Sequence, residues 1–103
     1  RMQQVFLNLV LNALDAMPSG GQLDLRTERA DQPPGVRVVL SDSGEGISPD
    51  VLPHIFEPFY TSKPEGLGLG LFISQEIVRQ HGGRIDVQSQ VDEGTTFTVW
   101  LPG

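Results

Sequence analysis

The stretch Gln4-Val-Phe-Leu-Asn-Leu-Val-Leu-Asn-Ala-Leu-Asp15 decides how the rest of this chain is organised. On a helix, four polar residues of this stretch fall within one sector of roughly 80°: Gln4, Asn8, Asn12 and Asp15. The other positions are almost all apolar, so we expect this helix to be buried on most sides. Buried amides are costly unless they are hydrogen-bonded or ligate a cation. Core neighbours would satisfy a single Asn, but two Asn one turn apart favour a polar cleft.

The composition limits the classes of function. A chain of 103 residues suits one domain, residues 1–103, with a single core. The net charge of -6 argues against nucleic acid or an anionic membrane as a partner, because both select clustered Lys and Arg. An acidic domain can still bind a nucleotide if a metal ion and helix N-termini supply a local positive field. The chain has no Cys, which excludes disulfides and thiolate metal sites.

The first half of the chain predicts a helix followed by a hairpin. The helix should run over residues 3–17 and end at the breakers of residues 18–21. Residues 22–28 alternate between apolar and polar side chains, as a half-solvated antiparallel strand does. The Pro- and Gly-rich stretch 31–35 reads as a turn before a second strand over 36–41. These two strands are predicted to pair.

The second half predicts two more helices and a second hairpin. Ser-Pro-Asp at the start of residues 48–54 is typical of a short capped helix. A longer helix over 68–80 should end at a glycine cap. Alternating strands over 84–89 and 95–101 should pair around a turn at 90–94. These proportions predict an α+β fold, a two-layer α/β sandwich in which helices cover one face of a mixed, mostly antiparallel sheet.

Two glycine-rich segments suggest a ligand site. In Asp42-Ser-Gly-Glu-Gly-Ile47, a carboxylate at the end of a strand precedes glycines that let a ligand approach the backbone, as in a base-recognition site. A simple tight turn explains the same pattern. Gly66-Leu-Gly-Leu-Gly-Leu71 opens the longer helix, and free N–H groups there suit a phosphate chain. Glycine repeats also serve loops and close packing.

The aromatic cluster over residues 55–60 is expected to anchor packing rather than to bind a ligand. The polar stretch 61–65 that follows is loop-like and short enough to form a small lid. It carries Lys63, the only Lys in the chain, as a candidate phosphate contact.

Taken in order, these segments resemble the catalytic, ATP-binding domain of bacterial sensor histidine kinases. That domain has the Bergerat ATP-binding fold, shared with the heat-shock ATPase chaperone, type II topoisomerases and MutL. The resemblance spans almost the whole chain, and its short lid is similar to the nitrogen-regulation type. Four boxes carry it: Asn8-Leu-Val-Leu-Asn12-Ala, Asp42-Ser-Gly-Glu-Gly46, Phe56-Glu-Pro-Phe59 and Gly66-Leu-Gly-Leu-Gly70-Leu.

The resemblance implies a Mg-ATP site. Asn12 would coordinate Mg²⁺ through its amide oxygen, and Asn8 would support the metal and phosphates beside it, so these two are the implied catalytic residues. Asp42 would accept a hydrogen bond from the adenine amino group, which selects adenine over guanine. The glycines of the box at residues 42–46, the first glycine box, would give the base room. Those of the box at residues 66–71, the second glycine box, would wrap the triphosphate. The remaining implied contacts are Gly44, Gly46, Ile47, Lys63, Gly66, Leu67, Gly68, Leu69, Gly70, Leu71 and Thr95.

The resemblance also favours one activity. ATP-hydrolysing and Ser-phosphorylating relatives often carry a Glu base where this chain has Asn8, which cannot take a proton at neutral pH. A histidine kinase needs no such base, because the imidazole is the nucleophile. Neither His54 nor His81 suits a phosphoacceptor. The alternative is an ATP-sensing or pseudokinase module that regulates a partner without transfer.

The remaining expectations concern context. The chain opens on Arg1 directly before a helix, without a starting Met, so we expect a domain excised from a longer protein. The acceptor His would lie on a separate helical dimerisation domain, acting in cis or in trans, with a response regulator downstream. No apolar run approaches the ~20 residues of a membrane span, and no signal peptide is present. We expect a cytoplasmic protein-histidine kinase domain without membrane contact, or the cytoplasmic part of a membrane-bound sensor.

Overall fold

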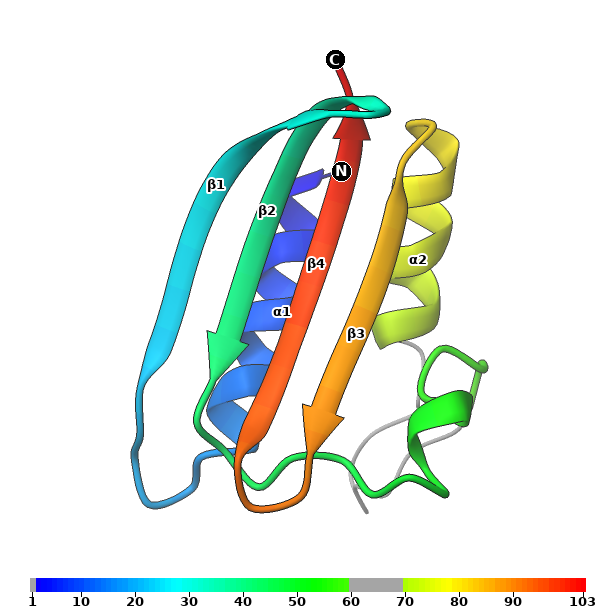
Figure 1. Ribbon diagram of the computed structural model, residues 1–103. Coiled ribbons are helices and arrows are strands. Elements are labelled where there is room, and N and C mark those ends of the chain that lie inside the picture. The colour runs from blue at the N-terminus through cyan, green and yellow to red at the C-terminus, as the bar shows by residue number, and fades with distance from the viewer. Residues whose placement is uncertain (1, 60–69) are drawn as a thin grey trace.

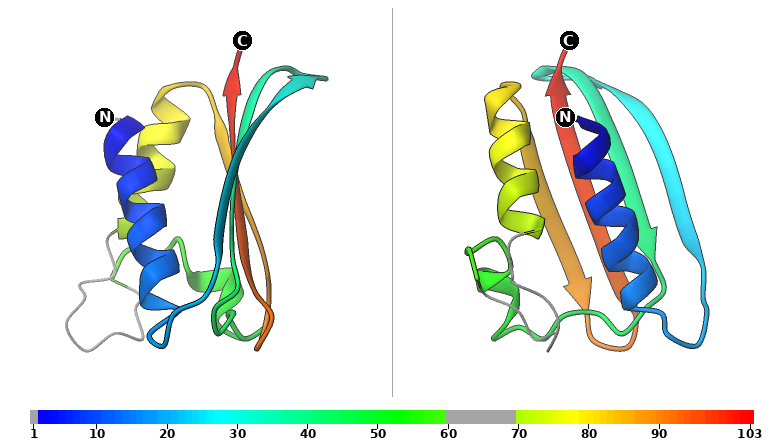
Figure 2. Two further views of the ribbon diagram at one scale, coloured as in Figure 1. Left: turned by 90° about the vertical axis from the view of Figure 1, so that its left-hand side faces the viewer. Right: turned by 180° about the vertical axis from the view of Figure 1, so that it is seen from behind.

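The molecule consists of one sheet and a layer of helices on one face of it (Figures 1 and 2). The computed structural model describes residues 2–59 and 70–103. Two α-helices, α1 (Met2–Asp15) and α2 (Gly70–Gln80), lie side by side on the sheet. The predicted α+β two-layer sandwich is confirmed. No helix in the described ranges is long and apolar enough to cross a membrane.

The sheet has four strands in the order β1-β2-β4-β3, and each neighbouring pair is antiparallel. Both predicted hairpins form, and the central pairing of β2 with β4 joins them. That pairing brings the end of β2 and the end of β3 beside the start of β4, at the lower end of Figure 1. The strands are β1 (Leu23–Asp31), β2 (Pro34–Asp42), β3 (Arg84–Gln90) and β4 (Gly94–Pro102).

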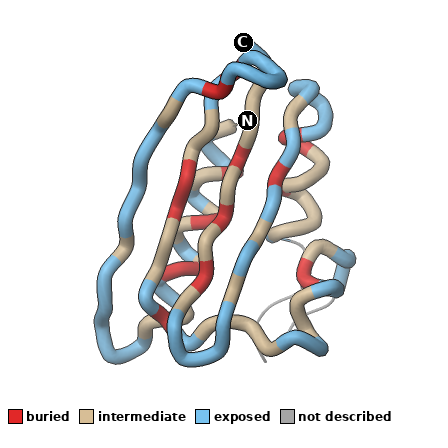
Figure 3. Tube along the Cα trace, viewed as in Figure 1, coloured by how far each residue is buried: buried red, intermediate tan, exposed pale blue. Residues whose placement is uncertain are grey.

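The core lies between the helices and the three strands β2, β4 and β3. Antiparallel register places residues of one face directly opposite each other, as with Leu40 and Phe97 in the β2–β4 pair. Figure 3 shows the buried positions along these strands and on the facing sides of the helices. The buried cluster comprises Val5, Leu9, Leu40, Ile55, Ile77, Val78, Ile85, Phe97 and Val99.

Helix α1 is not buried on most sides, contrary to the expectation from its composition. Leu7, Leu11 and Leu14 are 58%, 48% and 53% exposed. These residues point away from the sheet, opposite to the buried stripe of Val5 and Leu9. A helix in the outer layer of a two-layer fold can bury only one stripe against the layer below. The apolar composition of this helix therefore exceeds what the described fold covers.

The edge strand β1 is also more exposed than its alternating pattern predicts. Leu25 belongs to the predicted apolar face, yet it is 61% exposed. Figure 2 shows the reason, because the helices cover the other strands while β1 twists away from them. The strand pairs with β2 on one edge only, and few apolar side chains cover either of its faces.

The prediction of a short helix over residues 48–54 is wrong for most of that segment. Only Leu52–His54 is helical, and it is a 3-10 helix without a side-chain cap. Two N–H groups, those of Val51 and Leu52, donate to the carbonyl of Ser48 at 3.1 and 2.9 Å. Pro53 brings no N–H group and disfavours helical geometry in the residue before it. One turn is therefore all that this segment forms.

The aromatic cluster behaves in part as a packing anchor. Ile55 is buried, and the ring of Phe56 meets that of Phe97 edge-on, with centroids 6.5 Å apart. Such T-shaped pairs are favourable beyond the area they bury. Phe59, in contrast, is 72% exposed and has a positive φ of 67°. Among the described residues of the cluster, the packing role thus belongs to Ile55 and Phe56, and Tyr60 lies outside the described residues.

The contrast between the two sides of α1 gives a stability test. Leu9→Ala should lower the free energy of unfolding by ~2–5 kcal/mol, because Leu9 is 1% exposed and its removal leaves a cavity. The matched variant Leu11→Ala should cost less than about 1 kcal/mol, since that side chain is half in water. Urea unfolding followed by circular dichroism measures both. Equal losses would contradict the burial pattern described above.

Candidate functional site

A row of polar side chains crosses the end of the sheet beneath the helices. Asp42 on β2 lies opposite Thr95 on β4, and Thr95 lies opposite Ser89 on β3. Each is an even number of residues from a core position of its own strand, so all three share the helix-covered face. Thr95 is 5% exposed. One carboxylate and two hydroxyls therefore lie side by side where the apolar core ends.

The two hydroxyls of this row form a connected network. The Ser89 and Thr95 oxygens lie 2.8 Å apart, and Ser89 Oγ is 3.1 Å from the carbonyl oxygen of Gly94. Ser89 Oγ also accepts the N–H of Ile47 at 2.7 Å. The sequence reasoning included Thr95 and Ile47 but missed Ser89. The signal that would have found Ser89 is its inward-facing register position beside the β3–β4 turn.

The loop after β2 is braced on both sides. Asp42 Oδ1 accepts the N–H of Gly44 at 2.9 Å. The Glu45 N–H donates to the carbonyl of Ala16, just beyond α1, at 3.0 Å. The Glu45 carbonyl accepts the N–H of Asp92, in the β3–β4 turn, at 2.7 Å. Because Oδ1 of Asp42 is engaged within the loop, Oδ2 is the oxygen through which this carboxylate can accept from a ligand.

The glycines of this loop are required by packing within the protein. A Cβ at Gly44 would lie 2.5 Å from the carbonyl oxygen of Ala16. A Cβ at Gly46, where φ is +75°, would overlap the backbone carbonyl of Gln90. The expectation was that these glycines give a base room. The structure adds that they let the loop approach α1 on one side and the β3–β4 turn on the other.

Helix α1, which carries the two asparagines, connects this loop to the start of α2. Asn8 Nδ2 lies 3.3 Å from the carbonyl oxygen of Gly70, the first residue of α2, and 3.2 Å from Ser74 Oγ. The backbone carbonyl of Asn12 accepts the N–H of Ala16 in an ordinary helical bond, and the Ala16 carbonyl accepts the N–H of Glu45 in the loop after β2. Protein neighbours thus satisfy the amide nitrogen of Asn8. This agrees with the simpler of the two explanations for the polar stripe, in which core neighbours rather than a ligand bond to an Asn.

The predicted site residues gather at one end of the molecule as far as the structure describes them. The asparagine pair, the Asp42 loop, Thr95 and the first residues of α2, Gly70 and Leu71, all belong to this end (Figure 1). The predicted lid and most of the second glycine box lie outside the described residues. The positions concerned are Lys63, Gly66, Leu67, Gly68 and Leu69.

The donor set bears on which ion this end can hold. Within residues 2–59 and 70–103, no three His, Cys, Asp or Glu side chains cluster so as to hold a metal ion. A cation here would take amide oxygens, water and ligand oxygens instead. Mg²⁺ suits such a site, because it keeps several waters and commonly shares its remaining positions with substrate phosphates. The residues present therefore fit Mg²⁺ that arrives with a polyphosphate.

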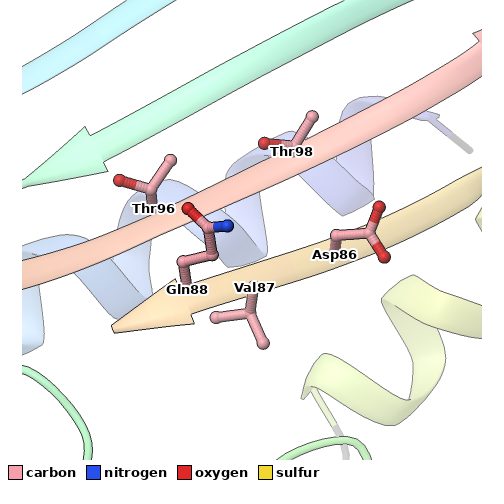
Figure 4. Close-up of a pocket in the computed structure, with 5 residues that line it drawn as sticks. All are labelled: Asp86, Val87, Gln88, Thr96 and Thr98. Atoms are coloured by element: carbon pink, nitrogen blue, oxygen red, sulfur yellow. The ribbon is translucent and has the colours of Figure 1, made fainter. Parts of the chain in front are cut away.

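An open hollow lies elsewhere, on the uncovered face of the sheet (Figure 4). Thr96 and Thr98 of β4 line it together with Asp86, Val87 and Gln88 of β3. None of the predicted site residues is among them. Because adjacent strand residues point to opposite faces, Thr96 lies on the other side of the sheet from Thr95. The hollow and the candidate site are separate features.

The chain matches one protein family over its whole length and is similar to known sensor histidine kinases. The family described as histidine kinase-, DNA gyrase B-, and HSP90-like ATPase matches residues 1–103. The chain is 47% identical over 102 residues to the sensor histidine kinase ZraS of Escherichia coli K12, covering 99% of this chain and 22% of ZraS. It therefore spans about a fifth of the length of this curated relative.

Two solved structures share the fold and are similar in sequence. The mycobacterial sensor histidine kinase MprB superposes with a TM-score of 0.84 at 36% identity, over 97% of this chain and 68% of that one. Full-length ShkA in complex with AMPPNP superposes with a TM-score of 0.81 at 29% identity, over 97% of this chain and 21% of that one.

A pair of glycine variants tests the packing of the loop. Gly46→Ala should cost about 1–3 kcal/mol of stability more than Gly20→Ala. Both glycines have positive φ, +75° and +92°, so both variants carry backbone strain. Only at Gly46 does the new Cβ meet protein atoms, whereas nothing lies within 4 Å at Gly20. Denaturant unfolding of the two variants isolates the contact with Gln90, and equal losses would rule it out.

Proposed function

Because the chain belongs to the histidine kinase-, DNA gyrase B- and HSP90-like ATPase family, we propose that it is the catalytic domain of a two-component sensor kinase. Domains of this family bind ATP, and ATP is the nucleotide that this chain uses. In our proposal it binds ATP with Mg²⁺ and transfers the γ-phosphate to a histidine of a helical dimerisation and phosphoacceptor domain. A response regulator would receive the phosphoryl group afterwards. The convergence of Asn8, Asn12 and Asp42 on one end of the fold carries the proposal.

Recognition of adenine would rest on the polar row at the end of the sheet. Asp42 Oδ2 would accept from the exocyclic amino group, and the Thr95 hydroxyl beside it would complete the pattern. Guanine presents a carbonyl oxygen at that position, which a carboxylate repels. Gly44, Gly46 and Ile47 supply the braced backbone next to the base. The complex of ShkA with AMPPNP, an ATP analogue, supports a nucleotide site in this fold.

Phosphate binding would involve α1 and the start of α2. Asn12 would hold Mg²⁺ through its amide oxygen, and Asn8 would support it. The first turn of α2 begins at Gly70, where N–H groups and the helix dipole favour anions. Lys63 and the glycine box from Gly66 to Leu71 would contact the triphosphate. When bound, Mg²⁺ would neutralise charge that develops on the phosphates.

Transfer to histidine agrees better with Asn8 than hydrolysis does. A water nucleophile requires a base, and the Asn8 amide cannot take a proton. An imidazole brings its own lone pair. Both histidines of the chain are engaged locally, His54 with Glu57 at 2.6 Å and His81 with the Ile77 carbonyl at 2.8 Å. In our proposal, the acceptor histidine lies on a partner domain.

Asp42→Asn tests base recognition. The variant keeps an oxygen for the Gly44 N–H, so its amide group turns a donor toward the base. Affinity for a fluorescent ATP analogue should fall about 10- to 100-fold, the effect of losing a charge-assisted hydrogen bond. Affinity for the guanine counterpart should fall less or rise. Fluorescence titration measures both.

The control for this experiment is Asp86→Asn on the opposite face of the sheet, where the carboxylate is 61% exposed. Its nucleotide affinity should equal that of the unmodified chain. If Asp42→Asn binds the ATP analogue as the unmodified chain does, the assignment of Asp42 to adenine is wrong.

Phosphotransfer is tested by adding the helical phosphoacceptor domain of the parent protein in trans with γ-labelled ATP. We expect acid-labile, base-stable label on the acceptor, lost when its histidine is replaced by Gln. Asn12→Ala should reduce the initial rate at least about 100-fold, because the metal ligand is removed. Mg-dependent nucleotide binding without any label on the acceptor would favour the ATP-sensing module instead.

A further inference from the structure

Ser74 is a buried polar residue for which the motifs of the sequence gave no role. It lies in the second turn of α2 and is 0% exposed. Its neighbours are the Asn8 amide and the Gly70 carbonyl. We propose that Ser74 is a positioning residue for Asn8, which fixes the direction in which that amide faces. The consequence for nucleotide binding rests on the proposed function, but the geometry does not.

The hydrogen bonds define the direction of the amide. Ser74 Oγ–H donates to the carbonyl of Gly70, one turn earlier, at 2.9 Å. With its proton used there, the hydroxyl presents a lone pair to Asn8, whose Nδ2 lies 3.2 Å away. The same Nδ2 is 3.3 Å from the Gly70 carbonyl oxygen. A flipped amide would turn Oδ1 toward the Gly70 carbonyl oxygen, and Ser74 could donate to Oδ1 only by giving up its own bond to that carbonyl.

This direction determines which atom Asn8 can present to a ligand. Both bonds to α2 use the amide nitrogen, so the carbonyl oxygen Oδ1 is directed elsewhere. A carbonyl oxygen can ligate a hard cation or accept from water bound to it, whereas an NH₂ group would favour a bare phosphate. Ser74 therefore leaves Asn8 Oδ1 to act as an acceptor toward Mg²⁺ or the water bound to it. The contact also ties Asn8 to the start of α2, which would face the phosphates.

A merely structural hydroxyl would behave differently. Serine commonly bonds the carbonyl four residues earlier in a helix, which is neutral or slightly destabilising. Alanine fits the same space and has a higher helix propensity. Replacing Ser74 by Ala should therefore change the unfolding midpoint little. The amide of Asn8 is the group that depends on the hydroxyl.

The first measurement needs no nucleotide. In ¹⁵N–¹H spectra of the full chain, the side-chain NH₂ signals of Asn8 are assigned by their loss in Asn8→Ala. In the unmodified chain they should be as ordered as the backbone. In Ser74→Ala they should shift and become mobile, while Ser74→Thr, which keeps a hydroxyl, should restore them. Unchanged Asn8 signals in Ser74→Ala would overturn the proposal.

The second measurement follows the Mg²⁺ dependence of fluorescent ATP-analogue binding. Ser74→Ala should raise the half-saturating Mg²⁺ concentration about 3- to 10-fold, the effect of one hydrogen bond. Affinity without Mg²⁺ should stay within about twofold. Asn8→Ala should have a similar effect, and the double variant should lose nothing further. A Mg²⁺ dependence altered by Asn8→Ala but not by Ser74→Ala would contradict the proposal.

The two measurements separate this inference from the proposed function. If the unmodified chain bound the analogue without any Mg²⁺ dependence, the proposed function would fail. The amide spectra would then still decide whether Ser74 positions Asn8.

Discussion

The antiparallel pairing of β2 with β4 is the constraint on which the rest of the structure depends. It joins two hairpins that lie far apart in the sequence, and it sets Leu40 opposite Phe97 in the core and Asp42 opposite Thr95 at the site. Because side chains alternate between faces, a slip of one residue would expose the core and turn the site row to the uncovered face. Burial of apolar side chains therefore holds the polar row in place.

In the loop after β2, the residues proposed to bind the base also have packing roles. Its glycines lie against the end of α1 and the β3–β4 turn, and Asp42 uses one carboxylate oxygen to hold the loop. The loop is thus braced by the protein alone, before any ligand arrives. Such preorganisation lowers the ordering cost of binding. The tight turn and the proposed base site are thus the same segment.

Helix α1 contributes to both layers of this arrangement. Its buried stripe packs on the sheet and α2, the Asn8 amide bonds the start of α2, and the backbone carbonyl of Ala16, just beyond the helix, holds the loop after β2. The outer stripe of Leu7, Leu11 and Leu14 faces solvent within the described structure. Apolar content alone could not distinguish burial against the sheet from exposure on the outer side. Only the position of the helix in a two-layer fold makes that distinction.

Local patterns in the sequence determined the two α-helices, both hairpins, the two-layer class and the order of the boxes that contain Asn8 and Asp42. These features depend on periodicity and turn residues, which act over a few positions. The tertiary structure alone decided the strand order, the solvent-facing leucines and the hydrogen-bond partners of Ser74 and Ser89. Register places Ser89 on the inward face of its strand, but no local pattern identifies the partner of such a serine. Its function depends on which distant group is brought within hydrogen-bond distance, here Asn8 and Ile47.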